Sequence, residues 1–268
     1  MTTTRTPGKC GLRPADPFRP APRFGVWWNR SVPAHPKTED YLASLADWAM
    51  LGNDQAGDCV AVTWANLRRL ITHFVGAKEI YPTQDQVWAI YRTQNPDFDP
   101  NGDADSTGPG SPADRGMDIQ TLLDYLVEHG GPDGVKAVAY AQVDALNESE
   151  LDAALAIFGG VWTGVVVQAA QQQQFAQGAE WDYDPDSPEE GGHSVLAGGY
   201  APDPRIITWA AETGFTDSFR THLVSQTWVV VWPEHLGSKA FLQGVDVKAL
   251  EADFTAVTGR RVEWPVTA

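Results

Sequence analysis

The chain has 268 residues, of which 43% are hydrophobic, enough apolar material for one large domain or two smaller lobes. Its formal net charge of −16 argues against nucleic acid as a partner and gains nothing from an anionic lipid surface. No apolar run reaches the length of a membrane span, and no apolar segment follows the N-terminal residues, so neither a membrane helix nor a signal peptide is expected. The chain has two cysteines and no Cys-x-x-Cys pair, which argues against a disulfide framework and a cysteine zinc site.

Residues 1–36 form a Pro/Arg-rich N-terminal arm with seven prolines and five arginines, a composition that is expected not to pack as a helix or a central strand. We expect this arm either to be disordered or to lie along a surface. The adjacent Trp27 and Trp28 favour the second alternative for its last part, because neighbouring tryptophans rarely stay in water. Cys10 lies in the arm and is interpreted as an incidental thiol.

Residues 37–134 are predicted to form a helical half. A turn-rich loop ends at Cys59, and apolar residues at helical spacing after it predict a buried helix of about four turns. A second helix is expected to begin after Thr83. Beyond a polar loop over residues 94–116, a third is expected to run to the glycines at 130–131.

Residues 135–235 are predicted to form a sheet half, and residues 236–268 a C-terminal helix and tail. Because helices come first and strands afterwards, the order indicates an α+β fold with a helical half and a sheet half. In chain order we expect a strand over residues 135–140, a helix over 147–158, a strand over 161–167, a polar stretch over 171–190, strands over 193–200, 205–209 and 227–232, and a closing helix over 237–258.

Cys59 would occupy the first turn of its helix, where the amide dipoles favour a thiolate and lower the thiol pKa. A thiolate nucleophile needs a base, usually histidine. His193 stands apart from the other five histidines because it follows two glycines and is expected to start a strand beside an open cleft. The plain alternatives are a small buried residue at a helix start for Cys59, and a histidine ending a polar loop for His193.

The order of several short motifs resembles that of papain-like cysteine peptidases over about residues 40–235. That resemblance implies a papain-like α+β fold with a cleft between the two halves. The Trp-x-Met-Leu-Gly-Asn-Asp-x-x-Gly-Asp-Cys segment and the Gly-Gly-His are also similar to those of a group of phage and prophage proteins without a settled function. The motifs are Asp47-Trp48, Asn53-Asp-Gln55, Gly57-Asp-Cys59, Gly192-His193, Gly199-Tyr200 and Thr208-Trp209.

The resemblance implies that Cys59 is the nucleophile and His193 the general base. The side-chain amide that binds the oxyanion would be Asn53, six residues before the cysteine, or Gln55, four residues before it. The asparagine that orients the histidine in this family corresponds to Ile207, which cannot form that hydrogen bond. Its neighbour Thr208 is expected to point to the opposite face of the strand, so His193 would either lack an orienting partner or take one from another segment. Further candidates for the cleft are Trp64, Thr208 and Trp209.

Three functions stay open. The first is a thiol hydrolase, a peptidase or amidase that needs no cofactor. The second is a catalytically lapsed phage virion protein whose N-terminal arm binds a neighbouring protein, and the third is a module that binds a peptide or cell-wall fragment. The host cytoplasm and the phage particle are the expected locations.

Two expectations about the thiols follow from the hydrolase interpretation. Cys59 Sγ and a ring nitrogen of His193 are predicted to lie within about 4 Å of each other. Cys59 is also predicted to react with iodoacetamide faster than Cys10, whose pKa should be near its ordinary value of about 8.5.

Two acidic loops are weaker candidates for further sites. Asp97, Asp99 and Asn101 match the start of an EF-hand calcium loop, but Gly108 occupies the position of the required glutamate, so a solvated turn is favoured over a calcium site. The acidic residues of the loop at 182–190 either line the rim of the cleft, where they would favour basic substrates, or form a solvated loop.

Overall fold

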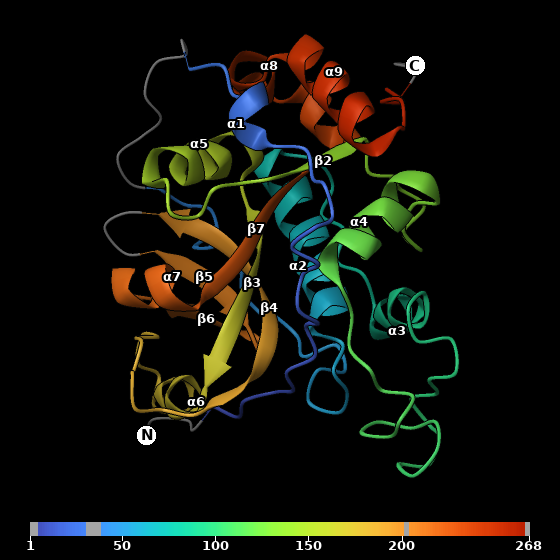
Figure 1. Cartoon of the computed structure of the whole chain (residues 1–268), viewed down its shortest axis with the longest axis vertical. Helices are drawn as coiled ribbons and strands as arrows, with labels where there is room; N and C mark the ends of the chain where they lie inside the picture. Colours follow the sequence, from blue (N-terminus) through green and yellow to red (C-terminus); the bar gives the residue numbers. More distant parts are fainter. Residues whose placement is uncertain (1–4, 31–38, 201–203, 266–268) are drawn as a thin grey trace.

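The computed structural model describes residues 5–30, 39–200 and 204–265. Its strands form an antiparallel sheet in the order β2-β7-β3-β4-β5-β6, and β1 pairs with the end of β4. Figure 1 shows this sheet on one side of the molecule and the helical half on the other. The strands are β1 (Glu39–Asp40), β2 (Ala139–Gln142), β3 (Val161–Gln168), β4 (Glu189–Tyr200), β5 (Arg205–Thr208), β6 (Ala211–Gly214) and β7 (Val224–Val231).

Helix α2 stands between the sheet and the other helices of the helical half, α3 and α4 (Figure 1). Within the described ranges, no helix is long and apolar enough to cross a membrane. The helices are α1 (Phe24–Trp27), α2 (Cys59–Phe74), α3 (Gln84–Arg92), α4 (Ile119–Glu128), α5 (Glu148–Phe158), α6 (Ala169–Gln177), α7 (Asp217–Leu223), α8 (Lys239–Gly244) and α9 (Val247–Thr258), with a 3₁₀ turn at Pro233–Gly237.

Local signals explain where the predicted helices begin and end. Helix α3 begins at a capping box, in which the Thr83 side chain accepts from the Gln86 backbone and the Gln86 side chain accepts from the Thr83 backbone. Helix α5 begins after Asn147, whose side chain caps it, and ends at Gly159, which has a left-handed backbone with φ of 76°. The expected starts of α2 and α3, the expected length of α2 and both expected ends of α5 are confirmed.

Helix α2 is buried all round, because the sheet covers one side and α3 covers another. Of its 16 residues, 14 are buried, although the sequence showed a single apolar stripe. Arg68 is fully buried in it and pairs with Asp133 at 2.7 Å and with Glu234 at 2.5 Å. The central helix therefore carries a charge that depends on two carboxylates from other parts of the chain.

Replacing Arg68 with alanine should destabilise the protein by about 3–5 kcal/mol, because the buried Asp133 would lose its partner. Burial favours a higher pKa for Glu234, but the hydrogen bond and charge of Arg68 outweigh it and lower that pKa overall. The stability contributed by this pair is therefore present above the ordinary glutamate pKa and is lost as the pH falls below it. Urea unfolding of Arg68→Ala and of the exposed control Lys248→Ala between pH 3 and 7 checks this; equal midpoints would contradict it.

Several elements and boundaries differ from the sequence-based expectations. A short helix, α1 (Phe24–Trp27), lies in the arm that was expected not to pack as a helix, and the strand expected over residues 135–140 is β2, Ala139–Gln142. Helices α6 and α7 and strand β6 were not expected; α6 is polar and is held by its caps, Gln168 and Gly178, rather than by an apolar stripe. The closing helix is two helices, because Asp246 caps a new start at α9. Strand β4 begins at Glu189, so His193 lies inside it and not at its start.

The last part of the N-terminal arm is packed against the body of the protein. Phe24 and Trp27 are fully buried. The Nε1 of Trp27 donates to Asp253 on α9 at 2.9 Å. The expectation that this part lies along a surface is confirmed.

Candidate active site

Cys59 and His193 line one small cavity of about 10 Å³ between α2 and the sheet. Cys59 is the first residue of α2, and His193 lies on β4, which packs against α2. Both are only 1% exposed. The structure thus brings together two residues that are far apart in sequence, and their predicted approach to within about 4 Å stays a prediction. The same cavity is lined by Asn53, Val62, Thr63, Asn66, Ser194, Ile207, Thr208 and Trp209.

Thr208 is the hydrogen-bond partner of the histidine. Its Oγ1 lies 2.7 Å from Nε2 of His193, and Trp209 packs on the imidazole with ring centroids 4.9 Å apart. Ile207 is paired with Leu196 in the sheet, and side chains alternate between faces, so Thr208 falls on the face that His193 occupies. Thr208 does point away from Ile207 as expected, but the conclusion that it could not orient His193 was wrong.

The other ring nitrogen of His193, Nδ1, is buried and makes no hydrogen bond with any residue that the structure describes. This nitrogen is the one left for a proton transfer, because Thr208 occupies Nε2. The backbone of Lys9 lies near the imidazole but forms no hydrogen bond with Nδ1.

Asn53, rather than Gln55, presents an amide to this site. Its side chain is 2% exposed, and its Nδ2 donates to the carbonyl oxygens of Lys9 at 3.0 Å and Ala56 at 3.2 Å. Gln55 is exposed and lines a separate hollow. Trp64, offered as a cleft residue, is fully buried beneath Gly131 on another side of α2 and does not line the Cys59 cavity.

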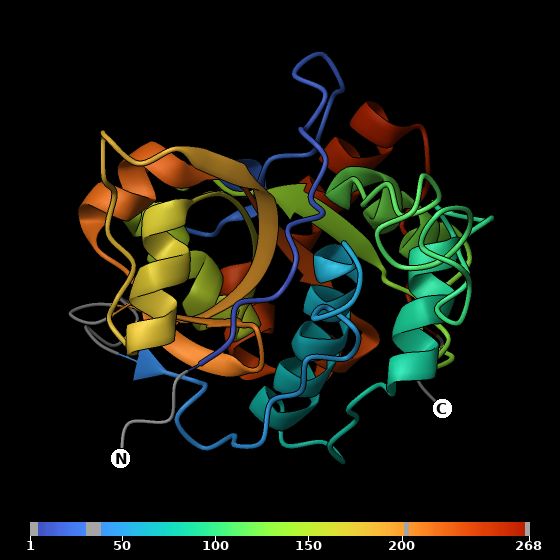
Figure 2. The same ribbon diagram turned by 90° about the horizontal axis from the view of Figure 1, so that it is seen from below.

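Part of the N-terminal arm passes directly over the site; we call residues 8–13 the covering segment. Its backbone is bonded to the loop before the cysteine by Lys9 N–H to Asn53 O at 2.7 Å. It is bonded to the residue before the histidine by Leu12 N–H to Gly192 O at 2.9 Å. Figure 2 shows this dark-blue segment passing between the sheet half and α2. The sequence had suggested a surface position for the arm without indicating the site as its place.

Glycine allows the covering segment to approach so closely. A Cβ on Gly11 would lie 1.9 Å from the carbonyl oxygen of Gly57, and one on Gly192 would lie 2.3 Å from the carbonyl oxygen of Leu12. No other residue fits at either position without movement of the backbone. Gly11 also accepts from the Met117 N–H at 2.8 Å, which ties the segment to the start of α4.

Burial under the covering segment keeps the Cys59 thiol and the His193 imidazole neutral. Burial, with a smaller contribution from Cys10, raises the pKa of the Cys59 thiol far above its ordinary value. Burial lowers the pKa of His193 to about 3, and the backbone of Lys9 opposes this fall. The expectation of a lowered Cys59 pKa is wrong for this covered state, because loss of water outweighs the helix dipole.

Cys10 lies inside the covering segment and close to the histidine strand. Its Cβ is 3.3 Å from the position that a Cβ on Gly191 would occupy. Burial and then the charge of Glu190 raise the pKa of Cys10 to about 11. The expectation of an ordinary pKa for Cys10 is therefore wrong, and Cys10 is not an independent control for Cys59.

The acidic loops show contacts of their own. Asp99 Oδ1 accepts from the Asn101 N–H at 2.9 Å, and the backbone N–H of Asp99 donates to Thr107 O at 2.9 Å, as in a closed turn. Asp182 accepts from the Thr216 hydroxyl at 2.5 Å. Across the described parts of the chain, no group of three or more histidine, cysteine or carboxylate side chains is arranged to hold a metal ion.

Comparisons with known proteins agree with this geometry at the level of the fold. No family model matches the sequence, and no curated protein matches it. Xylellain, a cysteine protease from Xylella fastidiosa, is similar in structure with a TM-score of 0.58 and 15% identity, over 86% of this chain and 98% of that chain.

Two further solved structures are similar. The proCathepsin B of Trypanosoma congolense has a TM-score of 0.54 and 12% identity over 83% of this chain and 86% of that chain. The proform of the ragweed allergen Amb a 11, a cysteine protease, has a TM-score of 0.55 and 17% identity over 79% of this chain and 70% of that chain. The chain therefore has the fold of the papain-like cysteine proteases, a mixture of helices and an antiparallel sheet.

Proposed function

We propose that this protein is a papain-like thiol hydrolase that cleaves peptide or amide bonds. Cys59 is the nucleophile, His193 the general base and then the general acid, and Thr208 orients His193. The Asn53 amide and the Cys59 backbone N–H bind the oxyanion. The observation that carries the proposal is the shared cavity of Cys59 and His193, with the free Nδ1 of the imidazole buried there.

A second contact supports the role of Asn53. Its Nδ2 already donates to a peptide carbonyl, that of Lys9, at 3.0 Å. An amide in the wall of the nucleophile's cavity, bonded to a carbonyl oxygen, is the arrangement that stabilises the negative oxygen of a tetrahedral intermediate. The Lys9 carbonyl therefore occupies the place we assign to the carbonyl of a substrate.

The reaction follows from these positions. Nδ1 of His193 takes the proton of the Cys59 thiol as Sγ attacks the carbonyl carbon, and the oxyanion forms against Asn53. The amine leaves with the proton from His193, and a thioester remains on Cys59. Water, activated by His193, then releases the acid and restores the thiol.

The covered site leads us to propose that the chain is held inactive by its own N-terminus. Neutral Cys59 and His193 under the covering segment cannot form the ion pair that makes a thiolate near neutral pH. Two of the similar structures are described as precursors, a proCathepsin and a proform. Displacement or cleavage of the segment would admit water and substrate to the cleft.

The sequence motif ending at Cys59 supports a finer proposal, that this is a hydrolase of phage or prophage type. It would act in the host cytoplasm or be carried in the particle. The rival function is a lapsed papain-like fold in a virion, or a module that holds a peptide without cutting it. The tight fit of the covering segment supports this rival function, because a site that stays covered is never reached by a substrate.

Labelling and cleavage assays separate these proposals. We expect an epoxysuccinyl peptide, which alkylates activated thiolates, to add once to Cys59 after the covering segment is displaced. Without the epoxide, the same preparation should release fluorescent peptides from labelled casein, and Cys59→Ala should reduce that release at least about a thousandfold. Labelling without cleavage would support the lapsed or binding protein. Cleavage that survives Cys59→Ala would overturn the hydrolase.

The Thr208 hydroxyl should matter for catalysis rather than for folding. Thr208→Val keeps the shape of the side chain but removes the partner of His193 Nε2, so kcat should fall at least about tenfold. Thr208→Ser restores the hydroxyl and should recover most of the rate. Casein cleavage and urea midpoints of both variants check this; equal rates in the valine and serine variants would show that Thr208 does not orient the imidazole.

A further inference from the structure

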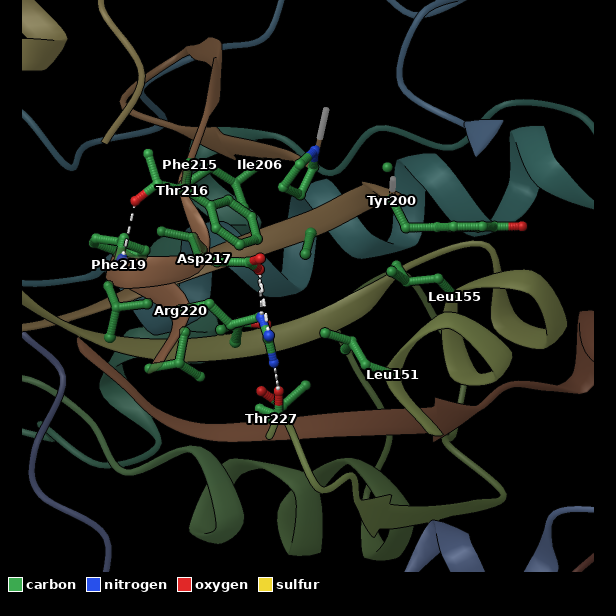
Figure 3. Close-up of a pocket in the computed structure, with 18 of the residues that line it drawn as sticks. Leu151, Leu155, Tyr200, Ile206, Phe215, Thr216, Asp217, Phe219, Arg220 and Thr227 are labelled. Carbon is green, nitrogen blue, oxygen red and sulfur yellow. Dashed lines mark hydrogen bonds and ion pairs between the residues drawn. The ribbon is translucent and has the colours of Figure 1, made fainter. Parts of the chain in front are cut away.

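A second cavity, of about 320 Å³, lies inside the sheet half and shares no lining residue with the Cys59 cavity. Its walls come from α5, α7 and strands β3, β4, β5 and β7, as the close-up in Figure 3 shows. The volume falls within the range of small-molecule sites, about 300–1,000 Å³. Nothing in the proposed hydrolase mechanism uses this cavity.

The body of the cavity is apolar. Leu151 and Leu155 of α5 face Ile206, Phe215 and Phe219 across it (Figure 3). Most of the apolar lining is buried, so an apolar group bound there would be shielded from water on the sides that face these residues. The strands add further apolar lining at Val165, Val195, Ala197 and Val224.

One buried hydroxyl lines this cavity without a partner. Thr227 is 1% exposed, and its Oγ1 makes no hydrogen bond with any described residue. Its neighbour across the ladder, Thr163, lines the same wall. A buried hydroxyl without a partner has lost its hydrogen bonds to water without replacement, and a ligand that offers a hydrogen-bonding group would remove this penalty.

Carboxylates dominate the charged part of the lining. Four acidic residues line the cavity against a single cation, Arg220. That guanidinium is already engaged, since its Nε and Nη2 lie 3.3 Å from Asp217 and its Nη1 donates to the Ala145 carbonyl at 2.8 Å. Glu148 and Glu180 form no ion pair with a described cation, and their negative charge favours a cation over an anion as the ligand. The acidic residues are Glu148, Asp152, Glu180 and Asp217.

We propose that this cavity binds a small amphiphilic amine with a compact aromatic body, a hydroxyl group at one end and a primary ammonium at the other. The ring would fill the space between α5 and the two phenylalanines. The hydroxyl would pair with Thr227, and the ammonium would lie among the carboxylates. The site does not depend on the proposed hydrolase function, and its test uses a chain that cannot perform the reaction.

Three matched compounds test the proposal on the full-length Cys59→Ala chain by calorimetry and by NMR of the methyl groups. Tyramine should bind saturably. Phenethylamine lacks the hydroxyl and should bind about two- to tenfold more weakly, the value of one hydrogen bond. 3-(4-Hydroxyphenyl)propanoate replaces the ammonium with a carboxylate and should bind at least about tenfold more weakly.

Variants locate the binding. Thr227→Val should remove the preference for tyramine over phenethylamine without lowering the thermal midpoint, because the lost hydroxyl has no partner among the described residues. Ala197→Leu should fill the cavity and abolish tyramine binding. Glu148→Gln should weaken the binding of tyramine by a factor of about two. Glu263 is exposed and does not line the cavity, so Glu263→Gln should leave the binding unchanged.

Several results would overturn the proposal. They are the absence of saturable tyramine binding, equal or tighter binding of the propanoate, and unchanged binding in a folded Ala197→Leu chain. If that variant does not fold, an unchanged preference for tyramine in Thr227→Val would overturn the proposal in its place. None of these outcomes bears on Cys59, so the hydrolase and the amine site can fail separately.

Discussion

Replacing Gly11 with valine in the full-length chain should raise the rate at which iodoacetamide alkylates Cys59 by about a hundredfold near neutral pH. A Cβ at Gly11 would lie 1.9 Å from the Gly57 carbonyl oxygen, so the covering segment cannot stay in place. Overpacking of this kind destabilises by about 3 kcal/mol, which is a factor of about a hundred in the ratio of covered to open chains. Once open, Cys59 is hydrated at a helix N-terminus, and its pKa falls.

Mass spectrometry of the two cysteine peptides gives the rates separately. Cys10 should also react faster in Gly11→Val, because it leaves its buried position with the segment. The control is Gly237→Ala, where a new Cβ meets nothing within 4 Å. If Gly11→Val and Gly237→Ala alkylate Cys59 at the same rate, the covering segment does not limit access to the site.

Acid should release the covering segment, with the open fraction rising about tenfold for each pH unit below about 6.5. Covered His193 has a pKa lowered to about 3 by burial, whereas a hydrated histidine titrates near about 6.5. Between these values the open form binds a proton that the covered form excludes. The covered form is therefore most stable relative to the open form above about pH 6.5, and it loses this stability as the pH falls toward 3.

Hydrogen exchange of the Lys9 and Leu12 amides, corrected for the intrinsic effect of pH, measures this release. His193→Gln, which stays neutral, should remove the pH dependence. Subtracting that variant also isolates His193 from Asp58, whose pKa is raised by burial and which acts in the opposite direction. Amides inside α2 report global unfolding, to which the buried His235, with a pKa lowered to about 4, contributes. Equal slopes with and without His193 would refute the mechanism.

Local sequence signals predicted those parts of the fold that depend on neighbouring residues. The caps at Thr83 and Asn147 and the glycine at 159 mark helix ends, because they satisfy backbone groups within a few residues of themselves. The polar helix α6 escaped prediction for the opposite reason: it lacks an apolar stripe, and only Gln171 and Phe175 are buried in it. Its existence depends on how its ends are held in the folded chain.

The partner of His193 could not be read from the chain. Whether Thr208 or Ile207 shares a face with the histidine depends on which residue of β5 pairs with which residue of β4, and a shift of one position reverses the answer. The structure pairs Leu196 with Ile207, which places Thr208 beside the imidazole. Motif alignment compared positions along the chain and had no access to this register.

The sequence by itself determined the α+β order of elements and the helix that begins at Cys59, and it predicted His193 as the companion of Cys59. These follow from spacing, capping and motif order, which are properties of the chain alone. Only the tertiary structure decided that Thr208 is the partner of His193, that residues 8–13 cover the site, and that burial, rather than the helix dipole, sets the Cys59 pKa. Burial arises when distant segments meet, and the loss of water that it brings outweighs a dipole that a local pattern can reveal.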